Sequence, residues 1–342
     1  MPITISGGVQ LSGPVLLDPT GGSSPSPSPG GGSSFQGSNY GYTSGGDNQP
    51  APYTNVIQKF SFTSDGNATD VGDLTISRAF LAGQSSSESG YSSGGYGGAS
   101  ALPNDYRDVI DKFPFSSDSN ATDVGDLLEA INANSGNSSS SNGYSSGGAP
   151  SSGNVNIIQK FPFASDGNAT DAADLLSATG SSAGQNSSVS GYQSGGSSPY
   201  QDVIQKFPFS SDSNATDVGD LVQARSRSGG QSSTTHGYVS GGTLGPSGGF
   251  AVTTTFEKFS FASDGNATNV GNITNTSGTG DGRSYIMAGQ SSTTSGYNTG
   301  GSQGNVPGRS NIIDKFPTAS DADATDVGDL TLNLLAVTAQ QY

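Results

Sequence analysis

One loop of the chain carries acidic and amide side chains at spacings that could surround a metal ion. Residues 65–73 place oxygen-bearing side chains at relative positions 1, 3, 5, 6 and 9. Calcium in proteins takes roughly six to eight oxygen ligands from carboxylates, amides and carbonyls. A repeated calcium loop is therefore one interpretation, since the same spacing recurs at residues 118–126, 166–174, 212–220 and 321–329.

The same residues also fit a hydrogen-bonded turn, because Asp and Asn side chains readily bond to nearby backbone groups. A fifth copy of the loop has Asn269 and Asn272 where the others have Asp. A hydrogen-bonding role survives that exchange better than a metal role does. We therefore interpret the loops as turns, assign no metal site and no cofactor, and keep calcium as the alternative. The last Asp of each loop is expected to pair with the lysine of its own blade, for example Asp220 with Lys206.

Residue types suited to hydrolysis are present but do not form a distinct set. Residues 90–94 and 143–147 match the Gly-x-Ser-x-Gly pattern of hydrolase nucleophiles. Both belong to a phrase whose four other copies lack that serine, and the single histidine, His236, has no unique acid or serine partner. Catalytic sites break repeat symmetry, so we predict no catalytic residues and no enzyme. A lyase or hydrolase propeller is the alternative.

These residues are positioned by a repeat of about 50 residues. One phrase, Lys-Phe-Pro-Phe-Ser-Ser-Asp-Ser-Asn-Ala-Thr-Asp-Val-Gly-Asp-Leu, occurs unchanged at residues 112–127 and 206–221. Variants of it begin at Lys59, Lys160, Lys258 and Lys315. A second phrase, Gly-Tyr-x-Ser/Thr-Gly-Gly, alternates with the first and ends at Gly46, Gly95, Gly148, Gly196, Gly242 and Gly301.

Each repeat offers four short strand-like stretches, which in the fourth repeat are residues 202–209, 215–222, a weaker one near 230–234, and 235–241. No stretch shows a helical period of useful length. Four strands in each of six repeats predict an all-β, six-bladed β-propeller. Residues 41–46 are a second phrase without a first, and residues 315–330 are a first phrase without a second. We expect these two half-blades to pair and close the ring.

Composition narrows the function further. The net charge is −16, and the six lysines are spread one to a repeat, so nucleic-acid binding is not expected. No apolar run approaches the ~20 residues of a membrane span, so membrane insertion is not expected. Cysteine is absent, which excludes disulfides and thiolate metal sites. The abundance of Gly, Ser and Pro favours disorder, but the fixed offsets of Phe and Tyr indicate a small repeated core.

The chain divides into three parts. Residues 1–18 hold scattered apolar side chains and are interpreted as a docking segment, with a disordered tail as the alternative. They lack the basic and apolar regions of a secretory signal. Residues 19–34 are a Gly/Ser/Pro linker and residues 35–342 the propeller. Specific recognition is expected at the inserts that break the repeat, because propellers usually bind through loops on one face; the inserts are residues 96–105, 245–255, 275–286 and 302–310.

Two resemblances bear on function. The Gly-Tyr-x-Ser-Gly-Gly phrase resembles the Gly-Gly doublet of kelch-type propellers, although kelch blades carry a Trp and this chain has none. The complete repeat, with Ala-Gly-Gln-Ser-Ser, more closely resembles repeat proteins of marine bacteriophages, cyanophages especially. The opening Met-Pro-Ile-Thr-Ile-Ser-Gly-Gly is also similar to the starts of virion proteins from such phages.

The phage resemblance implies a non-enzymatic protein of the virion surface: a tail fibre, knob or capsid decoration that serves host adsorption or particle stability. Its implied partners are other virion proteins, bound through residues 1–18, and a glycan or protein of the host surface. The alternative is a secreted carbohydrate-binding adhesin or lectin, which would need a cleaved leader.

Overall fold

The computed structural model describes residues 36–48, 53–98, 105–248, 251–274, 283–284, 288–303 and 308–342. The chain separates into two compact units, Met1–Gly32 and Ser33–Tyr342, and all the described residues belong to the second. The predicted docking segment, residues 1–18, and the predicted linker, residues 19–34, lie outside the described residues.

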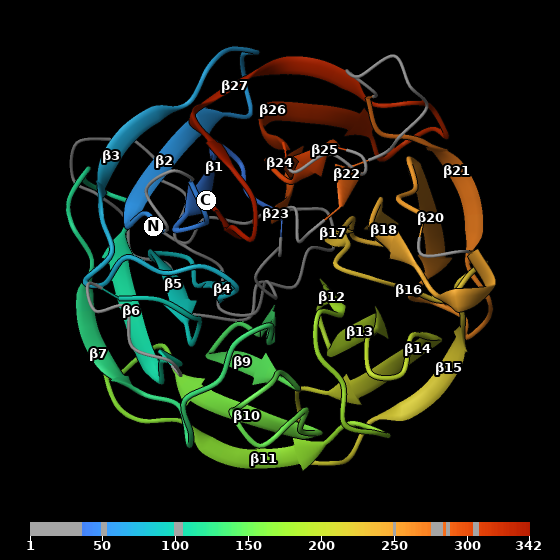
Figure 1. The fold of residues 1–342 in the computed structure, drawn as a ribbon, viewed down its shortest axis with the longest axis horizontal. Coiled ribbons are helices and arrows are strands. Elements are labelled where there is room, and N and C mark those ends of the chain that lie inside the picture. The colour runs from blue at the N-terminus through green and yellow to red at the C-terminus, as the bar shows by residue number, and fades with distance from the viewer. Residues whose placement is uncertain are drawn as a thin grey trace, which may run out of the picture. The chain divides into compact units, whose positions relative to one another are not determined.

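The second unit is a six-bladed β-propeller of antiparallel, four-stranded blades (Figure 1). From the inner strand outwards, blade one contains β28 (Thr338–Gln341), β1 (Tyr40–Ser44), β2 (Val56–Ser61) and β3 (Thr69–Asp73). Blade two contains β4 (Ala82–Ser85), β5 (Ser89–Ser93), β6 (Val109–Pro114) and β7 (Thr122–Asp126). Blade three contains β8 (Ser135–Ser138), β9 (Asn142–Ser146), β10 (Ile157–Pro162) and β11 (Thr170–Asp174).

The remaining blades follow the same order. Blade four contains β12 (Ala183–Asn186), β13 (Ser190–Gly196), β14 (Gln201–Pro208) and β15 (Thr216–Asp220). Blade five contains β17 (Gly229–Ser232), β18 (His236–Ser240), β20 (Thr255–Ser260) and β21 (Thr268–Asn272). Blade six contains β23 (Ala288–Ser291), β24 (Ser295–Thr299), β26 (Gly308–Pro317) and β27 (Thr325–Leu334). The predicted all-β propeller is therefore confirmed.

A few short elements lie between the blades. Strand β16 (Arg225–Ser226) pairs with β19 (Thr243–Leu244). Strand β22 (Arg283–Ser284) pairs with β25 (Ser302–Gln303), which in turn pairs with β26. A single turn of 3₁₀-helix, Pro246–Gly248, is the only helix among the described residues. None of the described residues forms a helix with the length and apolarity needed to span a membrane.

Pairing between the two ends of the ring closes it, as the sequence predicts, but with a different partner strand. Strand β1 pairs with the C-terminal strand β28, from Gly41 opposite Gln341 to Ser44 opposite Thr338 (Figure 1). The expectation that residues 41–46 complete the blade of residues 315–330 is wrong, because β26 pairs with β24 and β27 instead. The C-terminal strand, Thr-Ala-Gln-Gln, was missed since it lacks the Gly and Ser of its Ala-Gly-Gln-Ser siblings.

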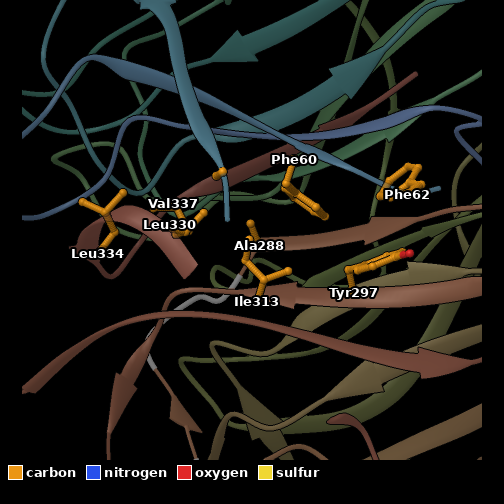
Figure 2. Close-up of a cluster of buried hydrophobic side chains, with 9 residues drawn as sticks. Phe60, Phe62, Ala288, Tyr297, Ile313, Leu330, Leu334 and Val337 are labelled. Atoms are coloured by element: carbon orange, nitrogen blue, oxygen red, sulfur yellow. The ribbon is translucent and has the colours of Figure 1, made fainter. Parts of the chain in front are cut away.

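Among the described residues, the buried apolar side chains form six clusters. In one of them Tyr297 of blade six stacks on Phe62 of blade one, with ring centroids 4.7 Å apart, and Phe60 lies beside both (Figure 2). The equivalent tyrosine of β5, Tyr91, stacks in the same way on Phe163 of the following blade. Because the glycine before the tyrosine faces a phenylalanine ring, a Cβ on Gly41 would lie only 2.4 Å from Phe60. Packing between blades thus fixes the offsets of Gly, Tyr and Phe that repeat in the sequence.

Candidate functional site

The ring has two faces that carry different kinds of loop. The hairpin face holds the turns between first and second strands and between third and fourth strands. In blade two a hydrogen bond from Phe115 N to Glu88 O, at 2.9 Å, joins these two turns. The insert face holds the connections from second to third strand and from each blade to the next. The described residues of all four predicted inserts lie in insert-face connections or at the insert-face ends of β20 and β26. That specific recognition occurs at these inserts stays a prediction.

On the hairpin face, each Asp/Asn loop docks on the blade before it. In blade one, Asp65 Oδ1 accepts a hydrogen bond from Lys315 Nζ of blade six at 2.8 Å, and Asn67 Oδ1 accepts one from Asp329 N at 3.1 Å. Ala68 N donates to Asp329 O at 2.8 Å. The loop is therefore a clasp between blades, and its side chains already hold protein partners.

The predicted pairing of each lysine with the last Asp of its own blade is wrong. Lys206 Nζ lies 2.8 Å from Asp264 Oδ1 of the next blade, and Asp220 instead donates its backbone N–H to Asn266. The six lysine bridges run around the ring and close on themselves: Lys59–Asp118, Lys112–Asp166, Lys160–Asp212, Lys206–Asp264, Lys258–Asp321 and Lys315–Asp65.

Two of the lysine bridges raise the pKa of their lysines. Hydrogen bonds to Asp166 and Asp65 raise the pKa of Lys112 and of Lys315, respectively, above the usual lysine value. Every Asp partner is more than half exposed, so each bridge contributes at most about 1 kcal/mol. Across the described residues, no group of three or more His, Cys, Asp or Glu side chains is arranged to hold a metal ion.

The residues that resemble hydrolase machinery lie apart in structural roles. Ser92 and Ser145 of the Gly-x-Ser-x-Gly copies are fully buried in second strands. Ser92 Oγ lies 2.9 Å from Ser44 Oγ, and Ser145 Oγ accepts a hydrogen bond from Asn134 Nδ2 at 2.8 Å. His236 begins β18, where its Nδ1 lies 2.8 Å from Thr235 Oγ1 and burial lowers its pKa. These contacts bring together no nucleophile, base and acid.

The inner strands surround an axial cavity of about 250 Å³ that opens on the hairpin face. Its lining comes from the Gly and Ser positions of the Ala-Gly-Gln-Ser motif, such as Gly83 and Ser85. The strands approach so closely that a Cβ on Gly83 would lie 2.1 Å from Ala339 O, and one on Gly136 would lie 2.1 Å from Gly83 O. Five blades therefore have glycine at this position beside the axis, and blade one has Ala339 there.

The glutamine of the same motif links neighbouring blades, a role that sequence reasoning missed. Gln84 Nε2 donates to Tyr144 O of the next blade at 3.0 Å, and Gln340 Nε2 donates to Tyr91 O at 2.9 Å. The bond recurs around the ring, with Asn137 in place of Gln in blade three. The sequence signal for this role was the recurrence of glutamine in a motif that otherwise consists of small residues.

The first described residues lie at the mouth of the axial cavity on the hairpin face. Gln36 Nε2 donates to Ser232 O at 3.2 Å, and Gly37 N donates to Ser291 O at 2.7 Å. Ser232 and Ser291 end the inner strands β17 and β23, just before their hairpin-face turns. The polypeptide therefore enters the ring near its axis, on the face opposite the inserts.

Two fully buried ion pairs between strands and connections were also missed. Arg78 Nη2 lies 3.1 Å from Asp111 Oδ2, with both side chains fully buried. Arg225 pairs in the same way with Glu257. Burial lowers the pKa of both arginines and raises the pKa of Glu257. The available signal was an acidic residue on the third strand where three other blades have Gln.

The insert face carries a wide cavity of about 640 Å³ where blade one meets blade two. Its walls are Tyr53 and Asn55 from the β1–β2 connection, Thr75, Ile76 and Ser77 from the β3–β4 connection, and Gly98 and Arg107 from the β5–β6 connection. This last connection contains the predicted insert at residues 96–105, of which 99–104 lie outside the described residues.

No protein-family model matches the chain, and no curated protein matches it.

Proposed function

We propose that this protein is a non-enzymatic surface protein of a bacteriophage virion, as a tail fibre, knob or capsid decoration. It displays its propeller on the virion surface for host adsorption or particle stability. The proposal starts from the resemblance of the repeat to those of marine phage proteins. Its partners are other virion proteins, bound through residues 1–18, and a glycan or protein of the host.

The observation that carries the proposal is the opposition of the two faces. Gln36 is bonded at the axis of the hairpin face, whereas the irregular inserts lie on the other face. The first described residues therefore lie on the face opposite the irregular connections. That arrangement suits a protein that is fixed on one side and displays its variable loops on the other.

The rigidity and charge of the ring agree with this role. Hydrogen bonds between neighbouring blades recur around the whole ring, among them the lysine bridges and the inner Gln and Asn bonds, so the ring can hold its loops in fixed positions. The net charge of −16 favours solubility and disfavours phosphate backbones. Many copies on one particle would raise the avidity of weak contacts by several orders of magnitude.

The test compares three proteins for incorporation into phage particles: the full chain, the chain without residues 1–18, and a chain with residues 1–18 scrambled. All three should melt at the same temperature, because the strands of the ring and their hydrogen bonds all lie after residue 35. Quantitative blotting of purified particles should find only the full chain at normal occupancy. Normal occupancy of the scrambled protein would show that the ring itself makes the attachment.

A secreted carbohydrate-binding adhesin or lectin is the second candidate, and the cavity at Tyr53 and Arg107 favours it. The two candidates differ in where the protein is found. Immunogold label found on purified particles would support the virion protein. Protein found only in the particle-free culture medium would support the adhesin.

A further inference from the structure

The cavity where blades one and two meet on the insert face, here called the Tyr53 pocket, breaks the symmetry of the ring. The residues at the position of Tyr53 in the other blades are Tyr106, Asn154, Tyr200, Val252 and Arg309. Only beside Tyr53 does the following blade contribute an insert with both an aromatic and an arginine side chain, Tyr96 and Arg107. A cavity of about 640 Å³ lies within the range of ~300–1,000 Å³ typical of small-molecule sites.

The aromatic wall of the pocket is held in place before any ligand binds. The ring of Tyr53 meets that of Tyr96 edge-on at a centroid distance of 6.1 Å, and Tyr96 meets Tyr106 edge-on at 5.3 Å. Gly97 has a φ of 139°, and a Cβ there would lie 2.7 Å from Tyr53 Cδ2. Because Tyr53 is already fixed, a ligand that stacks on it loses little affinity to side-chain ordering.

The polar wall is also fixed, and its charge is balanced. Arg107 Nε donates to Gly97 O at 2.6 Å, and its Nη2 is bonded to the carboxylate of Asp105. Thr75 Oγ1 donates to Asp111 Oδ1 at 2.6 Å. No carboxylate is among the described residues that line the cavity, and Arg107 is already paired with Asp105, so neither a cation nor an anion finds an unpaired opposite charge on these residues.

Several groups of the wall keep hydrogen-bonding capacity for a ligand. Arg107 Nη1 and the Tyr53 and Ser77 hydroxyls are without a hydrogen-bond partner among the residues that the structure describes. Asn55 donates through Nδ2 to Leu74 O at 3.4 Å, which leaves its Oδ1 as an acceptor. The pocket thus combines one aromatic face with both donors and acceptors and carries no net charge.

We propose that the Tyr53 pocket binds a neutral sugar unit. A sugar ring offers C–H groups to stack on Tyr53 and hydroxyls that both donate and accept hydrogen bonds. An anionic sugar is disfavoured by the acidic chain and by Asp105 beside Arg107. This inference rests on the proposed function in one respect: it identifies the host-surface ligand as a glycan.

The test measures binding of the full chain to glucose, galactose, mannose and N-acetylglucosamine by saturation-transfer NMR and calorimetry, with glucuronate and glucosamine as charged comparators. At least one neutral sugar should bind, with a dissociation constant on the order of millimolar. Tyr53→Ala, which removes the aromatic face, and Ser77→Trp, which fills the cavity, should each weaken binding by about tenfold or more. Tyr200→Ala, at the matched position of blade four, should leave binding unchanged.

Melting temperatures establish that each variant is folded. The two pocket variants change the volume of the pocket in opposite directions, since Tyr53→Ala enlarges it and Ser77→Trp fills it. The proposal is overturned if none of the four neutral sugars binds, if a charged comparator binds more tightly than all of them, or if Ser77→Trp binds normally. Particle occupancy is measured separately. Normal occupancy without sugar binding rejects the pocket but not the virion role, whereas sugar binding by a protein absent from particles does the reverse.

Discussion

Asp323 of blade six accepts two hydrogen bonds from Asn272 of blade five through the same oxygen: Oδ1 lies 2.9 Å from the backbone N and 3.2 Å from Nδ2. In the other five junctions the residue types are exchanged. Asp73 N, for example, donates to Asn120 Oδ1 at 3.1 Å. Each junction therefore keeps one carboxylate and one amide. That balance gives a physical reason for Asn272 in the fifth copy of the loop.

Asn272→Asp should destabilise the ring, because it places a second carboxylate beside Asp323. Both side chains are exposed, so the loss of unfolding free energy should be about 0.5–1 kcal/mol. It should shrink in acid, because protonation of the carboxyls removes the repulsion. Chemical denaturation at pH 7 and at pH 3.5, in low salt, measures both effects.

The matched control is the double variant Asn272→Asp with Asp323→Asn, which reproduces the residue pair of the other five junctions. Its stability at pH 7 should return to that of the parent chain. A double variant as unstable as Asn272→Asp alone would show that the charge balance is not the cause.

Removing one partner of the buried pair Arg78–Asp111 should lower the unfolding free energy more than replacing both residues does. Removing Asp111 alone, as Asp111→Ala, strands a fully buried guanidinium and should cost about 3–5 kcal/mol. Arg78 already has two nitrogens, Nε and Nη1, without a hydrogen-bond partner in the described part of the chain. The pair is thus imperfectly satisfied even in the intact protein.

Blade three shows what can replace the pair, because it has Ile131 and Gln159 at the same positions, both fully buried. Gln159 keeps a hydrogen bond to the connection from the preceding blade, because its Oε1 accepts one from Leu128 N at 2.7 Å. Arg78→Ile with Asp111→Gln should therefore stay within about 1–2 kcal/mol of the parent. Urea unfolding of the double variant and of its two single variants, Arg78→Ile and Asp111→Gln, tests this. A double variant less stable than both single variants would contradict it.

The sequence predicts the propeller well because its repeat records contacts made six times. The four strands expected in the fourth repeat match β14, β15, β17 and β18 closely. Their grouping was wrong, because β14 and β15 complete blade four whereas β17 and β18 begin blade five. A repeat shows which residues recur but not which copy each one touches. For the same reason the lysine was predicted within one blade, although Lys206 bridges to Asp264 of the next.

The residues of the Tyr53 pocket are harder to predict, because they do not repeat. Tyr53 and Arg107 are 54 positions apart in adjacent blades, and no local pattern joins them. The sequence located the insert at residues 96–105 but not the wall that faces it. Only the spatial order of the connections brings Asn55, Ser77 and Arg107 around one cavity.

Chelation should have little effect on stability. The Asp65 carboxylate is bonded to Lys315, and the Asn67 amide oxygen is bonded to Asp329 N. A calcium ion would have to displace both partners. We expect the melting temperature to change by less than about 1 °C when EDTA is added. A large loss that calcium restores and magnesium does not would show that the loops bind calcium.

Closure of the ring should depend on the C-terminal strand. Strand β28 is the inner strand of blade one and lies between β1 of its own sheet and the inner strands β4 and β23 of neighbouring blades. Its Gln340 Nε2 donates to Tyr91 O, and its Val337 neighbour lies in the cluster with Phe60. Removing residues 338–342 therefore leaves β1 as an unpaired edge and breaks the inner hydrogen-bond circle.

Two truncations separate closure from simple shortening of the chain. The protein without residues 1–34 should melt within a few degrees of the full chain, because the ring strands begin at Tyr40. The protein without residues 338–342 should melt at least about 10 °C lower, since it loses four backbone pairings and several buried contacts. Calorimetry of the two proteins decides the matter. Equal melting temperatures would mean that β28 does not hold the ring closed, and that five complete blades suffice for its stability.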